Sequence, residues 1–123
     1  MKNILAFGAS SSVNSINKKF AYYSSKQIPN SITNLLDLND FEMPIFSIDK
    51  QKDTGIPQAA MVFKKHISNS DAIIISFAEH NGSYTAAFKN ILDWVSRIER
   101  IVWCGKPMFL ISASDGERGA KLV

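Results

Sequence analysis

Three serine hydroxyls lie close together near the start of the chain, at Ser10, Ser12 and Ser15, and six of the eight residues from 10 to 17 are Ser or Asn. Hydroxyl groups donate hydrogen bonds to phosphate oxygens, and the first turn of an α-helix adds unpaired N–H groups and the positive end of the backbone dipole. Together they can hold a dianionic phosphate without Lys or Arg. Ser and Asn also cap helices and form turns, so the loop alone leaves both interpretations open.

The residues on either side of this loop predict the elements that position it. The apolar run from Ile4 to Phe7 has no polar alternation, as expected for a strand buried on both faces. A helix is predicted from about Ser15 to Gln27, because the Ile-Pro-Asn sequence at 28–30 is a stop signal. The buried side of that helix is expected to hold Ile16, Phe20 and Tyr23.

Strand and helix patterns alternate along the rest of the chain. The predicted elements are a strand from Ile32 to Leu38, a helix from Pro57 to Ser68, a buried strand from Asp71 to Ala78, a helix from Ala86 to Arg100 and a buried strand from Met108 to Ser112. Residues 39–46 mix large apolar side chains with turn formers, so we expect them to pack against the domain's own rim or a partner. Residues 47–55 are polar and expected to be mobile, and neither a helix nor a strand is predicted there.

This order predicts an α/β fold in which helices cover both faces of a parallel sheet, because parallel strands need crossover connections. In such sheets, ligands bind at the carboxyl ends of the strands. Polar loops follow the first, third and fourth predicted strands, so all three are expected at that edge. Their convergence favours the ligand-binding interpretation of the first loop.

Composition narrows the class of protein. A chain of 123 residues predicts a single domain over 1–123, and 46% hydrophobic with 20% charged residues is typical of a globular protein. We predict no membrane partner, since no apolar run approaches the ~20 residues of a span, and no nucleic-acid partner, since the net charge of +3 is spread over scattered lysines. The single Cys104 excludes an internal disulfide and a multi-cysteine metal site. It is typical of a reducing compartment, so we expect a cytoplasmic location and no metal.

Three segments resemble the NADPH-dependent FMN reductase family of flavodoxin-like proteins, which also contains quinone and azo reductases. The first loop is similar to the family's phosphate loop, Gly-Ser-x-Arg-x-x-Ser-x-Asn, with Ala9 at the Gly position and Ser12 at the Arg position. Residues 78–83 are similar to Pro-Glu-Tyr-Asn-x-Ser, with Ala78 and His80 as departures, and residues 88–97 to Leu-Lys-Asn-Ala-Ile-Asp-Trp-x-Ser-Arg. Residues 112–119 resemble the family's Ser-x-Ser-x-Gly-x-x-Gly turn.

The resemblance implies a flavodoxin-like three-layer sandwich with strand order 2-1-3-4-5, of which four strands are counted, FMN as cofactor and NAD(P)H as co-substrate. No catalytic side chain is expected, because the cofactor carries the chemistry. Residues implied to hold the phosphate are Ser10, Ser12, Ser15, Ile16 and Asn17. Those implied along the isoalloxazine are Glu79, His80, Asn81 and Gly82, with Ser114 and Gly116 near its far edge.

The implied activity is an FMN-dependent NAD(P)H oxidoreductase that passes hydride to the flavin and electrons on to a quinone, azo compound or flavin. Two alternatives stay open: a flavin-binding electron carrier without turnover, favoured by Ser12 in place of Arg, and a non-catalytic α/β remnant that self-associates. With four strands counted before Val123, the domain is expected to be C-terminally incomplete, as a fragment, a truncated product or one completed by another chain. In the family, the helix matching 86–100 borders a dimer interface, so a homodimer or higher homo-oligomer is expected.

Overall fold

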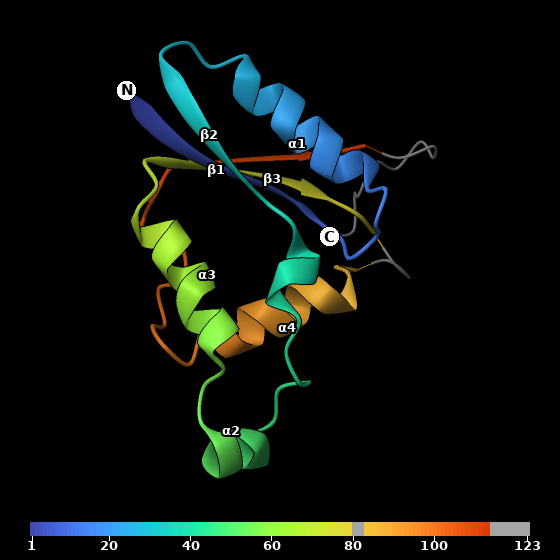
Figure 1. Cartoon of the computed structure of the whole chain (residues 1–123), viewed down its shortest axis with the longest axis vertical. Helices are drawn as coiled ribbons and strands as arrows, with labels where there is room; N and C mark the ends of the chain where they lie inside the picture. The colour runs from blue at the N-terminus through green and yellow to red at the C-terminus, as the bar shows by residue number, and fades with distance from the viewer. Residues whose placement is uncertain (80–82, 114–123) are drawn as a thin grey trace.

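The computed structural model describes residues 1–79 and 83–113 of the chain. In chain order, its elements are β1 (Lys2–Ala9), α1 (Ile16–Lys26), β2 (Ser31–Leu36), the 3-10 helix η1 (Leu38–Phe41), α2 (Ile48–Thr54), α3 (Gln58–Ser68), β3 (Ala72–Phe77), α4 (Ala86–Val95) and β4 (Met108–Ser112). The strands are parallel and ordered β2-β1-β3-β4 (Figure 1). The predicted α/β class and flavodoxin-like order are therefore confirmed.

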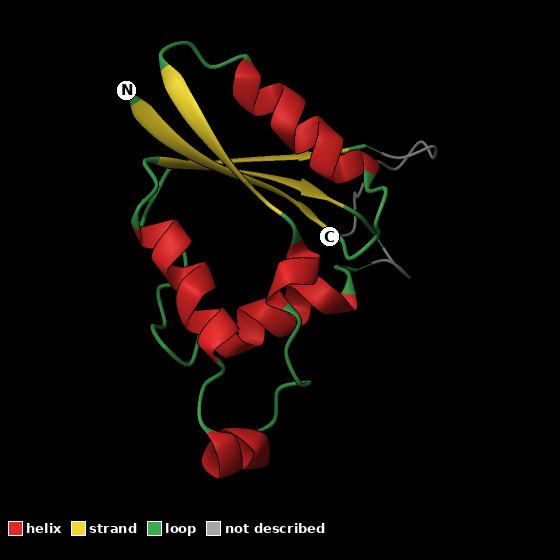
Figure 2. Cartoon of the chain, in the orientation of Figure 1, coloured by secondary structure: helices red, strands yellow, loops and turns green. Residues whose placement is uncertain are grey.

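Helices cover both faces of the sheet, with α1 on one side and α3 and α4 on the other (Figure 2). The central strand β1 is buried on both faces, as its unbroken apolar run predicts: Leu5 and Phe7 point into the larger core and Ile4 into the smaller one under α1. In the larger core, the rings of Phe7 and Phe63 pack in a T-shaped arrangement at a centroid distance of 5.5 Å. The sheet is thus the middle of three layers.

Helix α1 lies unusually close to the sheet, and this changes which of its residues are buried. A Cβ on Gly8 of β1 would be 2.4 Å from the backbone nitrogen of Lys18, so only glycine permits the approach. Small side chains fill the gap, and the buried residues of α1 are Asn17, Ala21 and Ser25. The predicted burial of Ile16 and Tyr23 is wrong, since they are 58% and 64% exposed, and Phe20 is half-buried.

Two predictions about the region after β2 are corrected. The strand ends at Leu36 rather than Leu38, because the Asp37 carboxylate accepts the backbone N–H of Asn39 and starts η1 there. Residues 47–55 are not a loop but contain α2, which has capping residues at both ends. The hydroxyl of Ser47 accepts the N–H of Lys50 at 3.0 Å, and Gly55 ends the helix with a φ of 75°.

Helix α4 and strand β4 also differ from expectation. Helix α4 ends at Val95 instead of reaching residue 100, and the chain continues through turns to residue 105. Strand β4 has the predicted bounds and pairs with β3, but it is not buried: Phe109 and Leu110 are 60% and 57% exposed. In the part of the chain that the structure describes, β4 is therefore an edge strand with large apolar side chains on its surface.

Candidate functional site

The loop between β1 and α1 forms a compact turn of hydroxyl and amide groups. The backbone nitrogen of Ser10 donates to the carbonyl of Gly8 at 2.8 Å, and the hydroxyl of Ser10 accepts the N–H of Ser12 at 3.1 Å. The hydroxyl of Ser15 caps α1 by accepting the N–H of Lys18 at 3.1 Å. Ser10 and Ser15 are buried, while Ser11 and Ser12 are exposed, so the loop has two buried hydroxyls and two at the surface.

Asn17 connects this loop to the ends of two other strands. It is 4% exposed, and its Oδ1 accepts the hydroxyl of Ser76 at 2.7 Å and the backbone N–H of Ala113 at 3.0 Å. Ser76 belongs to β3, and Ala113 directly follows β4. One side chain thus joins the start of α1 to the carboxyl ends of β3 and β4.

Thr85 brings the start of α4 to the same edge. Its hydroxyl donates to the carbonyl of Ala9 at 2.9 Å and accepts the N–H of Phe88 at 3.3 Å, so one buried residue both caps α4 and ties it to the end of β1. The N-termini of α1 and α4 therefore lie at the carboxyl edge of the sheet. Both present the positive end of a helix dipole there.

The electrostatic surroundings of the β1–α1 loop favour an anion. The chain contains no Asp or Glu before Asp37, while four lysines precede it. The Lys18 ammonium pairs with Asp37 at 2.9 Å. The N–H of Asn39 lowers the pKa of Asp37 below its usual value, and the Lys18 ammonium adds to that shift. The first carboxylate of the chain is thus neutralised by a lysine of α1, and no acidic residue lies in the first turn of that helix.

The structure describes six of the predicted site residues. Ser10, Ser12, Ser15, Ile16 and Asn17 form one turn, and Glu79 lies two residues past the end of β3, half-buried. Residues outside the described part of the chain are His80, Asn81, Gly82, Ser114 and Gly116, so their placement stays a prediction.

Sequence reasoning missed Ser76 and Thr85, which hold the site together. Ser76 is a polar residue at the end of the apolar strand β3, and a buried hydroxyl in such a strand needs a hydrogen-bond partner. That signal was available in the sequence, but it does not name the partner, which lies 59 positions away at Asn17. Thr85 precedes an apolar helix and is recognisable as a cap, yet its bond to Ala9 depends on the fold.

The described residues provide neither a metal-binding cluster nor a membrane-spanning helix. They contain no group of three or more His, Cys, Asp or Glu side chains arranged to hold a metal ion. None of the helices within 1–79 and 83–113 has the length and apolar character needed to cross a bilayer.

Comparison with known proteins adds to this geometry. The family model described as NADPH-dependent FMN reductase matches residues 2–123. A 2-hydroxy-1,4-benzoquinone reductase from a Burkholderia species is 32% identical over 111 residues, which are 89% of this chain and 58% of that protein. A quinone reductase from Pseudomonas putida is 32% identical over 107 residues, 85% of this chain and 56% of that protein.

Among solved structures, a flavoenzyme NAD(P)H:(acceptor) oxidoreductase from Paracoccus denitrificans is similar with a TM-score of 0.79 and 30% sequence identity, over 100% of this chain and 66% of that one. The chain spans little more than half the length of these two curated relatives. The family match nevertheless covers nearly every residue of the chain, including the segments 10–17, 78–83 and 112–119. The chain belongs to the NADPH-dependent FMN reductase family.

Proposed function

We propose that the protein is an FMN-dependent NAD(P)H oxidoreductase whose acceptor is a quinone or a similar small molecule. The bound flavin would supply the redox chemistry, taking hydride from the nicotinamide and passing electrons to the acceptor. The observation that carries the proposal is the Asn17 junction, which brings the opening of α1 to the ends of β3 and β4. A cofactor with a phosphate at one end and a flat ring at the other needs such a junction of loops.

The described donor groups fit the phosphate end of FMN. The first intrahelical bond of α1 runs from Lys19 N to the Ser15 carbonyl at 3.3 Å, so the N–H groups of Ile16 and Asn17 precede it and are directed out of the helix end. The hydroxyls of Ser10, Ser12 and Ser15 lie in the same turn. These groups would bind the phosphate through N–H and O–H donors, without the family's Arg at position 12.

Asn17 would act mainly as a positioning residue for this phosphate loop. Both of its described hydrogen bonds are made by Oδ1, so the amide Nδ2 is the part of the side chain that can serve a ligand. We assign Glu79, His80, Asn81 and Gly82 to the isoalloxazine and Ser114 and Gly116 to its far edge, on the strength of their loop positions and the family match.

The names of the relatives support the choice of acceptor. One is a 2-hydroxy-1,4-benzoquinone reductase and several are quinone reductases, so we take a quinone as the first acceptor to test. Azo compounds and free flavins are the next acceptors to compare.

The test is an absorbance spectrum of the purified chain with and without added FMN, followed by NADPH consumption with a quinone. Bound-flavin bands and quinone-dependent turnover are expected. Flavin binding without turnover would instead support the electron-carrier alternative, which Ser12 in place of Arg favours. A protein that stays colourless when FMN is added would overturn both.

We also propose a homodimer and a cytoplasmic location. The exposed face of α4, which includes Lys89, and the apolar edge of β4 are both available for self-association. The single Cys104 is half-buried, in keeping with a reducing compartment. Light scattering of the purified chain tests the first proposal, and fractionation of the source cells tests the second.

A further inference from the structure

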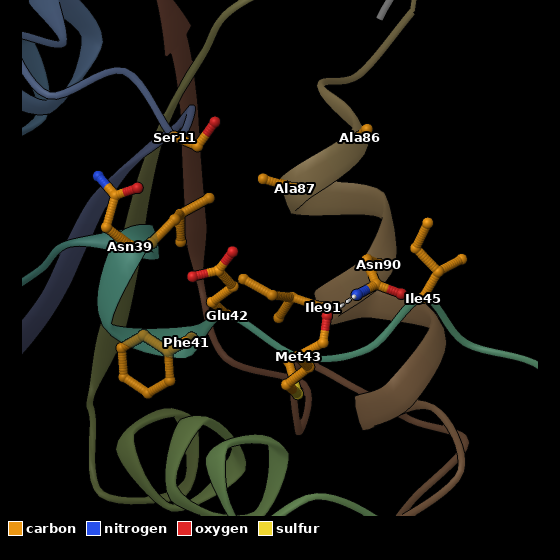
Figure 3. Close-up of a pocket in the computed structure, with 11 residues that line it drawn as sticks. Ser11, Asn39, Phe41, Glu42, Met43, Ile45, Ala86, Ala87, Asn90 and Ile91 are labelled. Carbon is orange, nitrogen blue, oxygen red and sulfur yellow. Dashed lines mark hydrogen bonds between the residues drawn. The ribbon is translucent and has the colours of Figure 1, made fainter. Parts of the chain in front are cut away.

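A pocket opens at the carboxyl edge of the sheet, between the β1–α1 loop, residues 38–45 and the first turns of α4 (Figure 3). Its volume is about 230 Å³. A dry apolar cavity of about 150 Å³ is large enough to bind benzene. This pocket, which is open to solvent on one side, therefore has room for a single aromatic ring with small substituents.

One wall of the pocket is held in place by α4. The side-chain Oδ1 of Asn90 accepts the N–H of Phe46 at 2.8 Å, while its Nδ2 donates to the carbonyls of Met43 and Pro44 at 3.2 Å each. Trp94 adds a bond of 2.7 Å from its Nε1 to the Pro44 carbonyl. With four such bonds already made, a ligand would not need to order this wall, which lowers the free-energy cost of binding.

The lining combines apolar side chains with a carboxylate. Leu38, Phe41 and Ile91 are buried residues whose surfaces face the pocket. The carboxylate of Glu42 points into the space between Asn39 and Ala87 (Figure 3). Among the described residues that line the pocket, Glu42 carries the single formal charge.

The apolar lining and the single carboxylate favour an uncharged ligand that can donate a hydrogen bond. A phosphate or carboxylate inside this pocket would be repelled by the carboxylate of Glu42, and no Lys, Arg or His side chain in the described lining offsets that charge. A hydroxyl on a flat apolar ring can donate to the carboxylate, and a hydrogen bond to an ionised acceptor is about twice as strong as one between neutral groups. The ring itself gains from burial against Leu38 and Ile91.

We propose that this pocket binds a neutral single-ring phenol or hydroquinone, with one ring hydroxyl donating to the carboxylate of Glu42. The inference rests in part on the proposed function, because a hydroquinone is what a quinone becomes after it accepts two electrons and two protons. Ser11, which lines the pocket, lies between Ser10 and Ser12 of the proposed phosphate loop. The reduced acceptor would therefore be held beside the loop that holds the cofactor.

The experiment is an anaerobic calorimetric titration of the full chain with three ligands of similar size. Hydroquinone has two hydroxyl donors, 1,4-dimethoxybenzene has the ring without donors, and benzoate has the ring with a negative charge. We expect hydroquinone to bind best and benzoate worst. Glu42→Gln is expected to weaken hydroquinone binding roughly tenfold, as for one lost charged hydrogen bond, and to leave dimethoxybenzene little changed.

Two further variants make the test specific. Asp40→Asn also removes one negative charge, from the 3-10 helix that Glu42 directly follows, but Asp40 does not line the pocket. The affinity of this variant for hydroquinone should therefore match that of the unmodified chain. Ala87→Leu places a larger side chain in the pocket and should reduce binding of every ring ligand, with the circular dichroism spectrum unchanged.

The outcomes separate this inference from the proposed function. Equal effects of Glu42→Gln and Asp40→Asn, stronger binding of benzoate than hydroquinone, or no binding of hydroquinone would each overturn the pocket assignment. FMN uptake, measured on the same preparations, reports on the proposed function alone. If the chain binds hydroquinone through Glu42 but takes up no FMN, the pocket assignment stands and the proposed reductase function is overturned.

Discussion

The side-chain Oδ1 of Asn17, in the first turn of α1, accepts a hydrogen bond of 2.7 Å from the hydroxyl of Ser76, at the end of β3. The same oxygen accepts the N–H of Ala113 at 3.0 Å. These groups are far apart in the chain, and both residues of the pair are nearly inaccessible to solvent. The bond between them fixes where the α1 opening lies relative to the neighbouring strands.

Removing either partner of this bond is expected to weaken both the fold and flavin binding. Ser76→Ala should lower the free energy of unfolding by about 1 kcal/mol. Asn17→Ala should lower it by about 2 kcal/mol, because it leaves the buried hydroxyl of Ser76 and the half-buried N–H of Ala113 without an acceptor. Urea denaturation measures the stability, and quenching of FMN fluorescence measures the affinity. Asn14→Ala, at an exposed position of the same loop, is the control. Unchanged FMN affinity in Asn17→Ala would remove Asn17 from the proposed site.

Gly8→Ala is expected to disrupt the contact between β1 and α1. The added Cβ would be 2.4 Å from the nitrogen of Lys18 and 2.8 Å from the carbonyl carbon of Asn17, so the helix has to move away from the strand. Overpacking of this kind costs about 1 to 3 kcal/mol. We expect a lower urea midpoint and weaker FMN binding than in the unmodified chain. A variant with the stability and FMN affinity of the parent would show that α1 is not held at this distance.

The Asp37 carboxylate should make stability depend on pH in the acid range. Its folded-state pKa is lowered, first by the N–H of Asn39 and then by Lys18, so its contribution is present above the usual carboxylate pKa of 3.8. That contribution is lost as the pH falls through the lower folded value. Asp37→Asn keeps a side-chain oxygen for the cap but removes the charge, so its unfolding free energy should fall less steeply with acid. Denaturation curves from pH 7 to about pH 3 measure the difference, with exposed Asp53→Asn as control. Identical slopes in the Asp37 and Asp53 variants would contradict the assignment.

Asn90→Ala is expected to loosen the segment that precedes α2. The change removes the acceptor for Phe46 N and both donors to the carbonyls of Met43 and Pro44, at a cost of about 2 kcal/mol. Limited proteolysis should then cut faster within residues 39–47. Lys89→Ala, at the preceding exposed position of α4, should leave the cleavage rate unchanged. Equal cleavage in both variants would mean that α4 does not hold this segment.

Lys64 is buried in α3, and its ammonium holds the connection between α4 and β4. It donates to the carbonyls of Ile101 at 3.1 Å and Val102 at 2.8 Å, and to the sulfur of Cys104 at 3.1 Å. Lys64→Met keeps an unbranched side chain of nearly the same length but removes the ammonium that these acceptors bind. The change should cost about 2 kcal/mol in unfolding free energy. The neighbouring Lys65→Met changes an exposed residue and should cost little. Similar losses in the two variants would show that the ammonium of Lys64 stabilises nothing.

The sequence predicts the strands of this fold better than its helix faces. Apolar runs without alternation identify β1 and β3 because both are covered on two sides. The assignment of Ile16 and Tyr23 to the buried side of the first helix is wrong, because burial on α1 is decided by the distance between the helix and the sheet. That distance depends on Gly8, whose neighbours come from a different part of the chain.

In the candidate site, too, the features set by local sequence are predictable and the long-range contacts are not. The hydroxyl-rich turn at 10–17 is visible in the sequence, because local residue types determine a helix cap and its donors. The bonds that join it to β3 and α4, from Ser76 and Thr85, are long-range, and no local pattern gives their partners. The assignments of residues 80–82 and of Ser114 and Gly116 stay predictions, since they lie outside the described residues.

Strand β4 is at the edge of the described sheet, so one side of its backbone has no neighbouring strand there. The exposed side chains of Phe109 and Leu110 lie on the same strand. Such an edge is a template on which an extended segment of another molecule can align. The purified chain is therefore expected to aggregate more as its concentration rises, and the turbidity of the solution should increase with concentration. Leu110→Lys would place a positive charge on this edge strand and so disfavour its pairing with another molecule. It is the first substitution to make before crystallisation or spectroscopy.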